Sequence, residues 1–153
     1  IRDGGAVVIY PEGTITREPD LWPMRGKTGA ARLALATGAP VVPLAMWGPQ
    51  RMFDPRRGKI HPRPRIPVAV QAGPPVDLSR WMGTTPSKQV LDEMTEEIML
   101  RVRDLVADLR GGTPPPLWSP SAAGTGAKDR PAPVDAAERT GRDGSEWTPG
   151  GGA

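Results

Sequence analysis

The chain has 153 residues and a mass of 16.3 kDa, which fits one domain and excludes two full ones. It contains no cysteine, so disulfides, thiolate zinc sites and cysteine nucleophiles are excluded. The net charge is +3, and no apolar run reaches the roughly 18 residues that a membrane-spanning helix needs.

The first predicted elements form a strand-helix-strand unit. The run Ala6-Val7-Val8-Ile9-Tyr10, ended by Pro11, is typical of a strand covered on both faces of a parallel sheet. Residues 28–37 are rich in Ala and Leu and are followed by Gly38, which predicts a helix with a glycine stop. Residues 41–47 predict a second buried strand, and we expect a right-handed crossover between the two strands.

Pro43 lies inside the second predicted strand, although a central strand needs its N–H groups for the ladder. It indicates a strand edge, a bulge or a functional irregularity. Residues 51–65 follow and hold six Lys or Arg residues and one acid. We therefore expect a basic loop there, and the alternation of Ile66, Val68 and Val70 predicts a further strand.

The last predicted element is a long amphipathic helix that starts at Thr85-Pro86. Its apolar residues recur at steps of three and four and include Leu91, Met94, Ile98, Val102, Leu105 and Leu109. Residues 111–153 then contain 9 Gly and 7 Pro and few large apolar residues, so we expect a disordered tail. The predicted domain is 1–110, of the α/β class, and it carries a net charge of about +4.

The loop after Tyr10 is the first candidate site, because ligands of open α/β sheets gather where strands end. Glu12, Gly13, Thr14 and Arg17 supply a carboxylate, a flexible glycine, a hydroxyl and a guanidinium within six residues. This set suits a phosphorylated polyol. An ordinary turn with a solvated charge pair is the alternative.

Gly26-Lys27-Thr28 precedes the predicted helix, and free N–H groups at a helix start bind anions. A phosphate-binding loop of nucleotide triphosphatases would need a glycine at position 21, where Leu21 stands. Lys27 is therefore a candidate phosphate or carboxylate contact, or else a solvated lysine. His61 is the only histidine and is interpreted as a structural or surface residue, and no metal site is predicted.

The basic loop 51–65 suits several partners, and charge alone does not choose between them. Anionic lipid headgroups, nucleic acid, a phosphorylated carrier and plain solvent all remain open. Phe53 is the only aromatic residue in the loop, which argues against a platform for single-stranded nucleic acid.

Three blocks together resemble the glycerolipid acyltransferases, specifically the lysophosphatidic acid (1-acyl-sn-glycerol-3-phosphate) acyltransferases. The sequence of these blocks is similar to that of the actinobacterial branch. They are Val7 to Thr14 with Pro-Glu-Gly-Thr, Met24 to Ala34, and Gly38 to Leu44. The resemblance covers residues 1–110 and implies the C-terminal part of a glycerol-3-phosphate acyltransferase-like mixed sheet flanked by helices.

The resemblance also implies site roles. Glu12, Gly13 and Thr14 would bind the glycerol phosphate of the acceptor, with Arg17 and Lys27 as further contacts, and Pro43 would lie near the acyl donor. In many members an arginine follows Glu-Gly-Thr directly, whereas Ile15 and Thr16 intervene here. The family's catalytic His-x-x-x-x-Asp pair is not found in this sequence, so we expect it upstream of Ile1 and expect the chain alone to be inactive.

The implied activity is transfer of a fatty acyl group to the sn-2 hydroxyl of lysophosphatidic acid, which makes phosphatidic acid. Acyl-CoA or acyl carrier protein would be the co-substrate, and no cofactor is implied. We expect peripheral contact with the cytoplasmic face of the cell membrane and no nucleic-acid partner. The alternative is a non-catalytic module that binds anionic lipid or nucleic acid through residues 51–65.

Overall fold

The computed structural model describes residues 1–54, 59–60 and 65–119. Its elements, in chain order, are α1 (Gly29–Thr37), β1 (Leu44–Trp47), η1 (Pro49–Arg51), β2 (Phe53–Asp54), β3 (Lys59–Ile60), β4 (Ala69–Ala72), η2 (Ser79–Trp81) and α2 (Lys88–Arg110). The expected disorder of residues 120–153, like the position of His61, lies outside the described residues.

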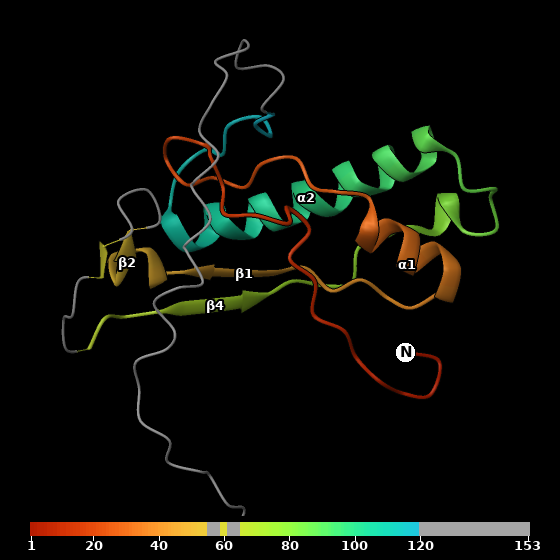
Figure 1. The fold of residues 1–153 in the computed structure, drawn as a ribbon, viewed down its shortest axis with the longest axis horizontal. Coiled ribbons are helices and arrows are strands. Elements are labelled where there is room, and N and C mark those ends of the chain that lie inside the picture. Colours follow the sequence, from red (N-terminus) through yellow and green to blue (C-terminus); the bar gives the residue numbers. More distant parts are fainter. Residues whose placement is uncertain (55–58, 61–64, 120–153) are drawn as a thin grey trace, which may run out of the picture.

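The long helix α2 is the support of the fold. It packs against β1 and β4 over one part of its length and against α1 over another (Figure 1). Its predicted apolar positions are confirmed, because Leu91, Met94 and Ile98 are buried against α1 and Trp81. The helix begins later than predicted: Ser87, not Thr85, is the N-cap, and its side chain accepts a hydrogen bond from Val90 N–H.

Helix α1 confirms the predicted helix at 28–37. It ends at Gly38, whose φ of 69° is left-handed and whose N–H donates to the Ala34 carbonyl. Ala31 and Ala34 are almost completely buried, so the small side chains bring α1 close to α2.

The sheet differs from the prediction. β1 pairs with β4 in an antiparallel register, with Leu44 opposite Ala72 and Trp47 opposite Ala69. Residues 6–10 form no strand, and Val8 is 84% exposed. The predicted parallel strand-helix-strand unit is therefore wrong for the described residues, because the first apolar run has no hydrogen-bonded strand partner there. The class remains mixed α/β.

Pro43 immediately precedes β1 and so needs no ladder donor. Its carbonyl accepts a hydrogen bond from Gly73 N–H at 3.0 Å, which extends the contact between the two segments beyond the strands. The strand predicted from Ile66 onward begins only at Ala69, after Pro67.

Residues 111–119 were expected to be part of the disordered tail, but they run back along the loop that precedes α1. Trp118 forms an isolated parallel bridge with Met24, and its carbonyl accepts from Arg25 N–H at 2.8 Å. Disorder is thus the wrong prediction for this short segment. No helix of the described residues is long and apolar enough to cross a membrane.

Candidate active site

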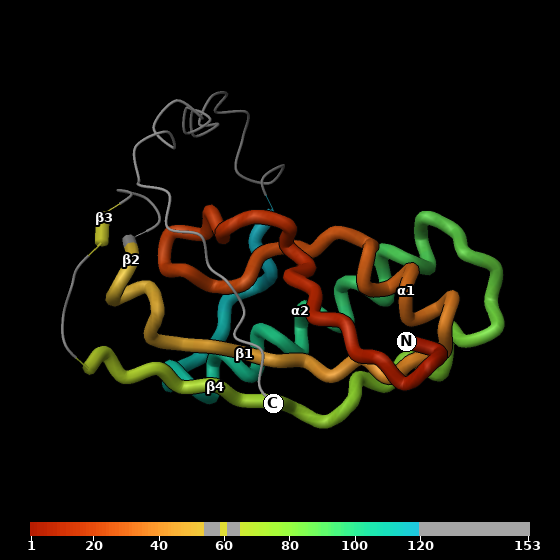
Figure 2. The backbone as a smooth tube through the Cα atoms, turned by 60° about the horizontal axis from the view of Figure 1, so that its bottom comes forward, coloured from red at the N-terminus to blue at the C-terminus, as the bar shows by residue number. Residues whose placement is uncertain are grey.

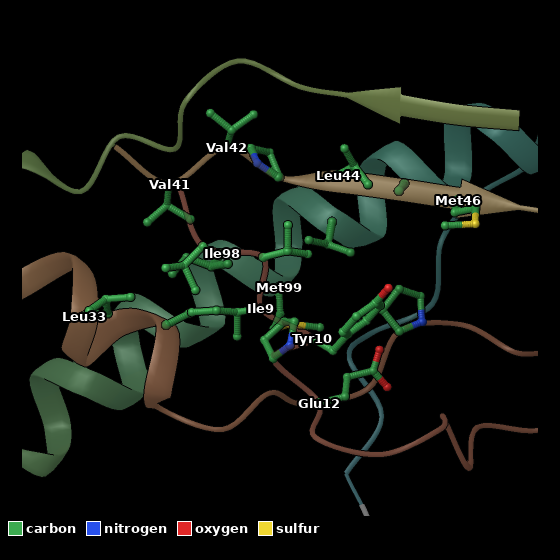
Figure 3. Close-up of a pocket in the computed structure, with 18 of the residues that line it drawn as sticks. Ile9, Tyr10, Glu12, Leu33, Val41, Val42, Leu44, Met46, Ile98 and Met99 are labelled. Carbon is green, nitrogen blue, oxygen red and sulfur yellow. The ribbon is translucent and has the colours of Figure 1, made fainter. Parts of the chain in front are cut away.

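A cavity of about 1090 Å³ lies between the first twelve residues and the helix-strand layer. Figure 3 shows Ile9, Tyr10 and Glu12 on one side, with Val41 and Val42 on the segment that leads into β1 and Leu44 and Met46 on β1 itself. Ile98 and Met99 of α2 and Leu33 of α1 also line it. The walls are predominantly apolar, so the cavity suits a hydrocarbon chain.

A tight turn closes the chain at the Pro-Glu-Gly-Thr block. Gly13 N–H donates to the Tyr10 carbonyl at 3.0 Å, and Gly13 has a φ of 66°, which favours glycine. Lys27 N–H donates to the Pro11 carbonyl at 2.7 Å. The turn is therefore hydrogen-bonded to Lys27, two residues before α1 begins.

The Lys27 side chain passes over this turn. A Cβ atom at Gly13 would lie 2.9 Å from Lys27 Nζ and 3.1 Å from Lys27 Cε. The glycine thus leaves the space that the ammonium group occupies. Gly13 and Lys27, which the sequence singles out separately, come together in the structure, and both lie at the surface where an anion can reach them.

Glu12 is the titratable group at the cavity. Its Oε2 is buried and has no hydrogen-bond partner among the described residues. Burial raises the pKa of Glu12 to about 7, and a hydrogen bond from the Met24 backbone N–H partly opposes that rise. Near neutral pH the carboxyl group therefore exists in both forms, and can donate a hydrogen bond to a ligand oxygen or accept one from a hydroxyl.

The other predicted contacts are less enclosed. Thr14 and Arg17 are exposed, and no ion pair of Arg17 is found within the described part of the chain. Pro43 lines the cavity, as its neighbour Leu44 does. Within residues 1–54, 59–60 and 65–119 no group of three His, Asp or Glu side chains is arranged to hold a metal ion.

The sequence did not single out Glu18, although this carboxylate fixes the loop after the turn. Its Oε2 accepts hydrogen bonds from Asp20 N–H at 2.7 Å and Trp22 N–H at 2.9 Å. Thr16 joins the same loop by donating to the Trp22 carbonyl at 2.7 Å. An acidic side chain that accepts hydrogen bonds from backbone N–H groups two and four residues later stabilises a loop locally. The Glu-Pro-Asp sequence at residues 18–20 is the signal from which this loop could have been predicted.

Gly26 and Trp118 do not line the cavity, but they hold the loop beside it in place. A Cβ atom at Gly26 would lie 3.1 Å from the Met99 side chain and 3.2 Å from Thr95, so glycine allows the loop to lie directly on α2. Trp118 pairs with Met24, the residue whose N–H holds Glu12. Both supports join residues far apart in the sequence, which local patterns do not reveal.

Comparison with known proteins finds similarity to acyltransferases. Residues 1–47 match the model of the family described as acyltransferase. A 1-acyl-sn-glycerol-3-phosphate acyltransferase of Limnanthes douglasii is 33% identical over 76 residues, which make up 50% of this chain and 25% of the relative. One of the same name from Limnanthes alba is 32% identical over 76 residues, with the same coverage.

The chain thus spans about a quarter of the length of the curated relatives it matches. No solved structure matches it. The resemblance to the glycerolipid acyltransferase family is confirmed by these matches, and the matched residues 1–47 include the turn, Lys27 and Pro43.

Proposed function

We propose that this chain, which carries sequence of the glycerolipid acyltransferase family, binds the acceptor in the synthesis of phosphatidic acid. The reaction would transfer a fatty acyl group from acyl-CoA or acyl carrier protein to the sn-2 hydroxyl of 1-acyl-sn-glycerol-3-phosphate. The observation that carries the proposal is the meeting of the Gly13–Lys27 turn with the Glu12 carboxyl group at an apolar cavity. The names of the Limnanthes relatives support the choice of acceptor.

Each part of such a substrate would contact a different group of side chains in the site. The phosphate would meet the Lys27 ammonium group and the exposed Arg17, since both are cations near the turn. Thr14 would add a hydroxyl contact. The glycerol oxygens would meet Glu12, and the hydrocarbon chain would lie in the cavity, with Pro43 on the side of the acyl donor.

The transfer itself joins the acceptor oxygen to the thioester carbonyl carbon. The carbon–oxygen bond forms, the carbon–sulfur bond breaks, and the thiol leaves while the hydroxyl proton passes to a base. A hydroxyl group is a weak acid, so the step needs a positioned base. The His-x-x-x-x-Asp pair expected upstream of Ile1 stays a prediction, and Glu12 is assigned to acceptor binding.

We place this activity at the cytoplasmic face of the membrane, with peripheral contact. Both substrates would be reached there, because a lysophospholipid partitions into the bilayer while acyl-CoA and acyl carrier protein are water-soluble.

Calorimetric titration of the purified chain tests acceptor binding without requiring turnover. Lysophosphatidic acid should bind more tightly than a monoacylglycerol of equal chain length, because only the former carries the phosphate. Lys27→Gln should remove roughly a tenfold advantage, as expected for a charged hydrogen bond. Lys88→Gln is the matched control, since Lys88 is exposed on α2 and pairs with Asp92.

Equal affinity for the phosphorylated and unphosphorylated ligands would refute the assignment of the phosphate site. Glu12→Ala should weaken both ligands, because both carry the glycerol oxygens. A variant that binds both as the parent does would remove Glu12 from the site.

A further inference from the structure

The β2–β3 pair extends from one end of the molecule. The two strands are antiparallel, and Phe53 lies opposite Ile60 in their register. Figures 1 and 2 show the pair beyond the end of β1, at the end of the molecule far from the start of α2. Residues opposite each other in an antiparallel pair extend to the same face, so Phe53 and Ile60 form one apolar patch.

This patch is open to solvent. Ile60 is 70% exposed, Met52 is 51% exposed and Phe53 is 39% exposed. Three exposed cations are close to it in the sequence: Arg51 directly before Met52, Lys59 directly before Ile60, and Arg65. We call these six residues the β2–β3 patch. Large exposed apolar side chains with cations on the same segment are typical of surfaces that rest on anionic membranes.

The β2–β3 patch is continuous with the cavity. Met52 and Phe53 belong to the patch and also line the cavity, which Glu12 lines as well. A lipid that leaves a bilayer beneath the patch therefore meets apolar side chains along its way into the cavity.

We infer that the β2–β3 patch docks the protein on an anionic lipid surface. The apolar side chains enter the headgroup boundary, and Arg51, Lys59 and Arg65 meet the phosphates. Nucleic acid would engage the same cations but would leave Met52 and Ile60 unused, and Phe53 is a single aromatic ring with no second one beside it in the patch. The observations thus favour lipid.

This docking rests on the membrane contact proposed above and gives it a location, and its test is distinct from that of acceptor binding. It concerns residues other than Glu12, Gly13 and Lys27, and it is read out by binding alone. A failure of lysophosphatidic acid to bind at the turn would therefore leave the docking unaffected, and the reverse also holds.

The test is co-sedimentation of the full chain with vesicles of phosphatidylcholine, with and without phosphatidylglycerol. Binding should require phosphatidylglycerol and weaken as salt is added. Lys59→Gln should reduce partitioning roughly fivefold, the effect of one cation near an anionic surface. Met52→Ser and Ile60→Ser should each reduce it roughly tenfold, because an apolar side chain no longer leaves water.

Two matched controls lie near the start of α2. Lys88→Gln removes an exposed lysine, and Met82→Ser removes a methionine that is 38% exposed. Both should partition like the parent. Circular dichroism spectra of all variants check that they are folded, and the exposed patch side chains can change without emptying the core.

Three outcomes would overturn the inference. The first is equal partitioning of Ile60→Ser and Met82→Ser. The second is equal binding to vesicles with and without phosphatidylglycerol. The third is salt-dependent binding of single- or double-stranded nucleic acid without binding to vesicles, which would assign the cations to the other partner.

Discussion

Replacing Glu12 by Gln should stabilise the protein at alkaline pH and have little effect at acid pH. The pKa of Glu12 is raised from 4.5 to about 7 by burial, so the folded state holds its proton more tightly than the unfolded state. Unfolding releases that proton between these two pKa values. The carboxyl group is therefore a cost to stability that grows from about pH 4.5 and is complete above about pH 7.

The size of the effect follows from the shift. One pKa unit corresponds to about 1.4 kcal/mol, and solvent screening at a partly buried carboxyl group reduces the effect, so the ionised Glu12 lowers the free energy of unfolding by about 1 to 2 kcal/mol. Glutamine keeps the shape and the polar atoms but carries no charge at any pH. The difference in free energy of unfolding between Glu12→Gln and the parent should hence rise by about 1 to 2 kcal/mol from about pH 4 to about pH 8.

Urea unfolding followed by tryptophan fluorescence measures this difference, because Trp22 and Trp81 are buried. The parent and the variant are compared at each pH, so titrating groups common to both cancel. Glu96→Gln is the control, since it removes a carboxylate that is half exposed on α2. It should change the free energy of unfolding by less than about 0.5 kcal/mol throughout. A Glu12→Gln difference that stays constant with pH would refute the buried, unpartnered carboxyl group.

Four further substitutions test the packing of the fold. Gly26→Ala should cost about 1 kcal/mol in urea unfolding because its Cβ meets the Met99 side chain at 3.1 Å, whereas Gly29→Ala, with nothing within 4 Å, should stabilise the start of α1 by about 0.5 kcal/mol. Gly48→Ala should cost at least about 2 kcal/mol, because Gly48 has a φ of 126° and its Cβ would meet the Pro67 carbonyl oxygen; a cost equal to that of Gly26→Ala would contradict this. Arg110→Gln should lower the free energy of unfolding by about 1 kcal/mol through loss of two ring contacts at 4.1 and 4.4 Å, and unchanged thermal unfolding would refute it.

The elements predicted well from the sequence are those whose signal is local. Steps of three and four between Leu91, Met94 and Ile98 require only one helix face, and α2 buries that face. Gly38 ends α1 by its own backbone conformation. The strand at 6–10 fails because a strand also needs a partner edge, which its own residues do not specify. The start of β4 is shifted because Pro67, inside the alternating run, donates no ladder hydrogen bond.

The residue types of the candidate site could be predicted from the sequence, but the contacts that bring these residues together could not. Glu12, Gly13 and Lys27 stand out as separate signals, since each residue type suits a phosphorylated ligand. The hydrogen bond from Lys27 N–H to the Pro11 carbonyl, which brings them together, spans sixteen positions and has no local pattern. The burial of Glu12 likewise depends on distant segments, since the cavity that it lines is formed with α1, α2 and the approach to β1.

The protonation of Glu12 links the energetics of the fold to the chemistry of the site. A partly buried carboxyl group destabilises the folded state whenever it is ionised, because burial removes water from the charge. A glutamine or an apolar residue in its place would avoid this loss of stability. The exchangeable proton is what those residues lack, since the neutral acid donates to a ligand oxygen and the carboxylate accepts from a hydroxyl. A ligand that supplies a hydroxyl hydrogen to Oε2 would favour the ionised form and lower the pKa of Glu12. Binding of a glycerol-bearing acceptor should therefore release protons near neutral pH, whereas a ligand that touches only Lys27 leaves Glu12 as it was.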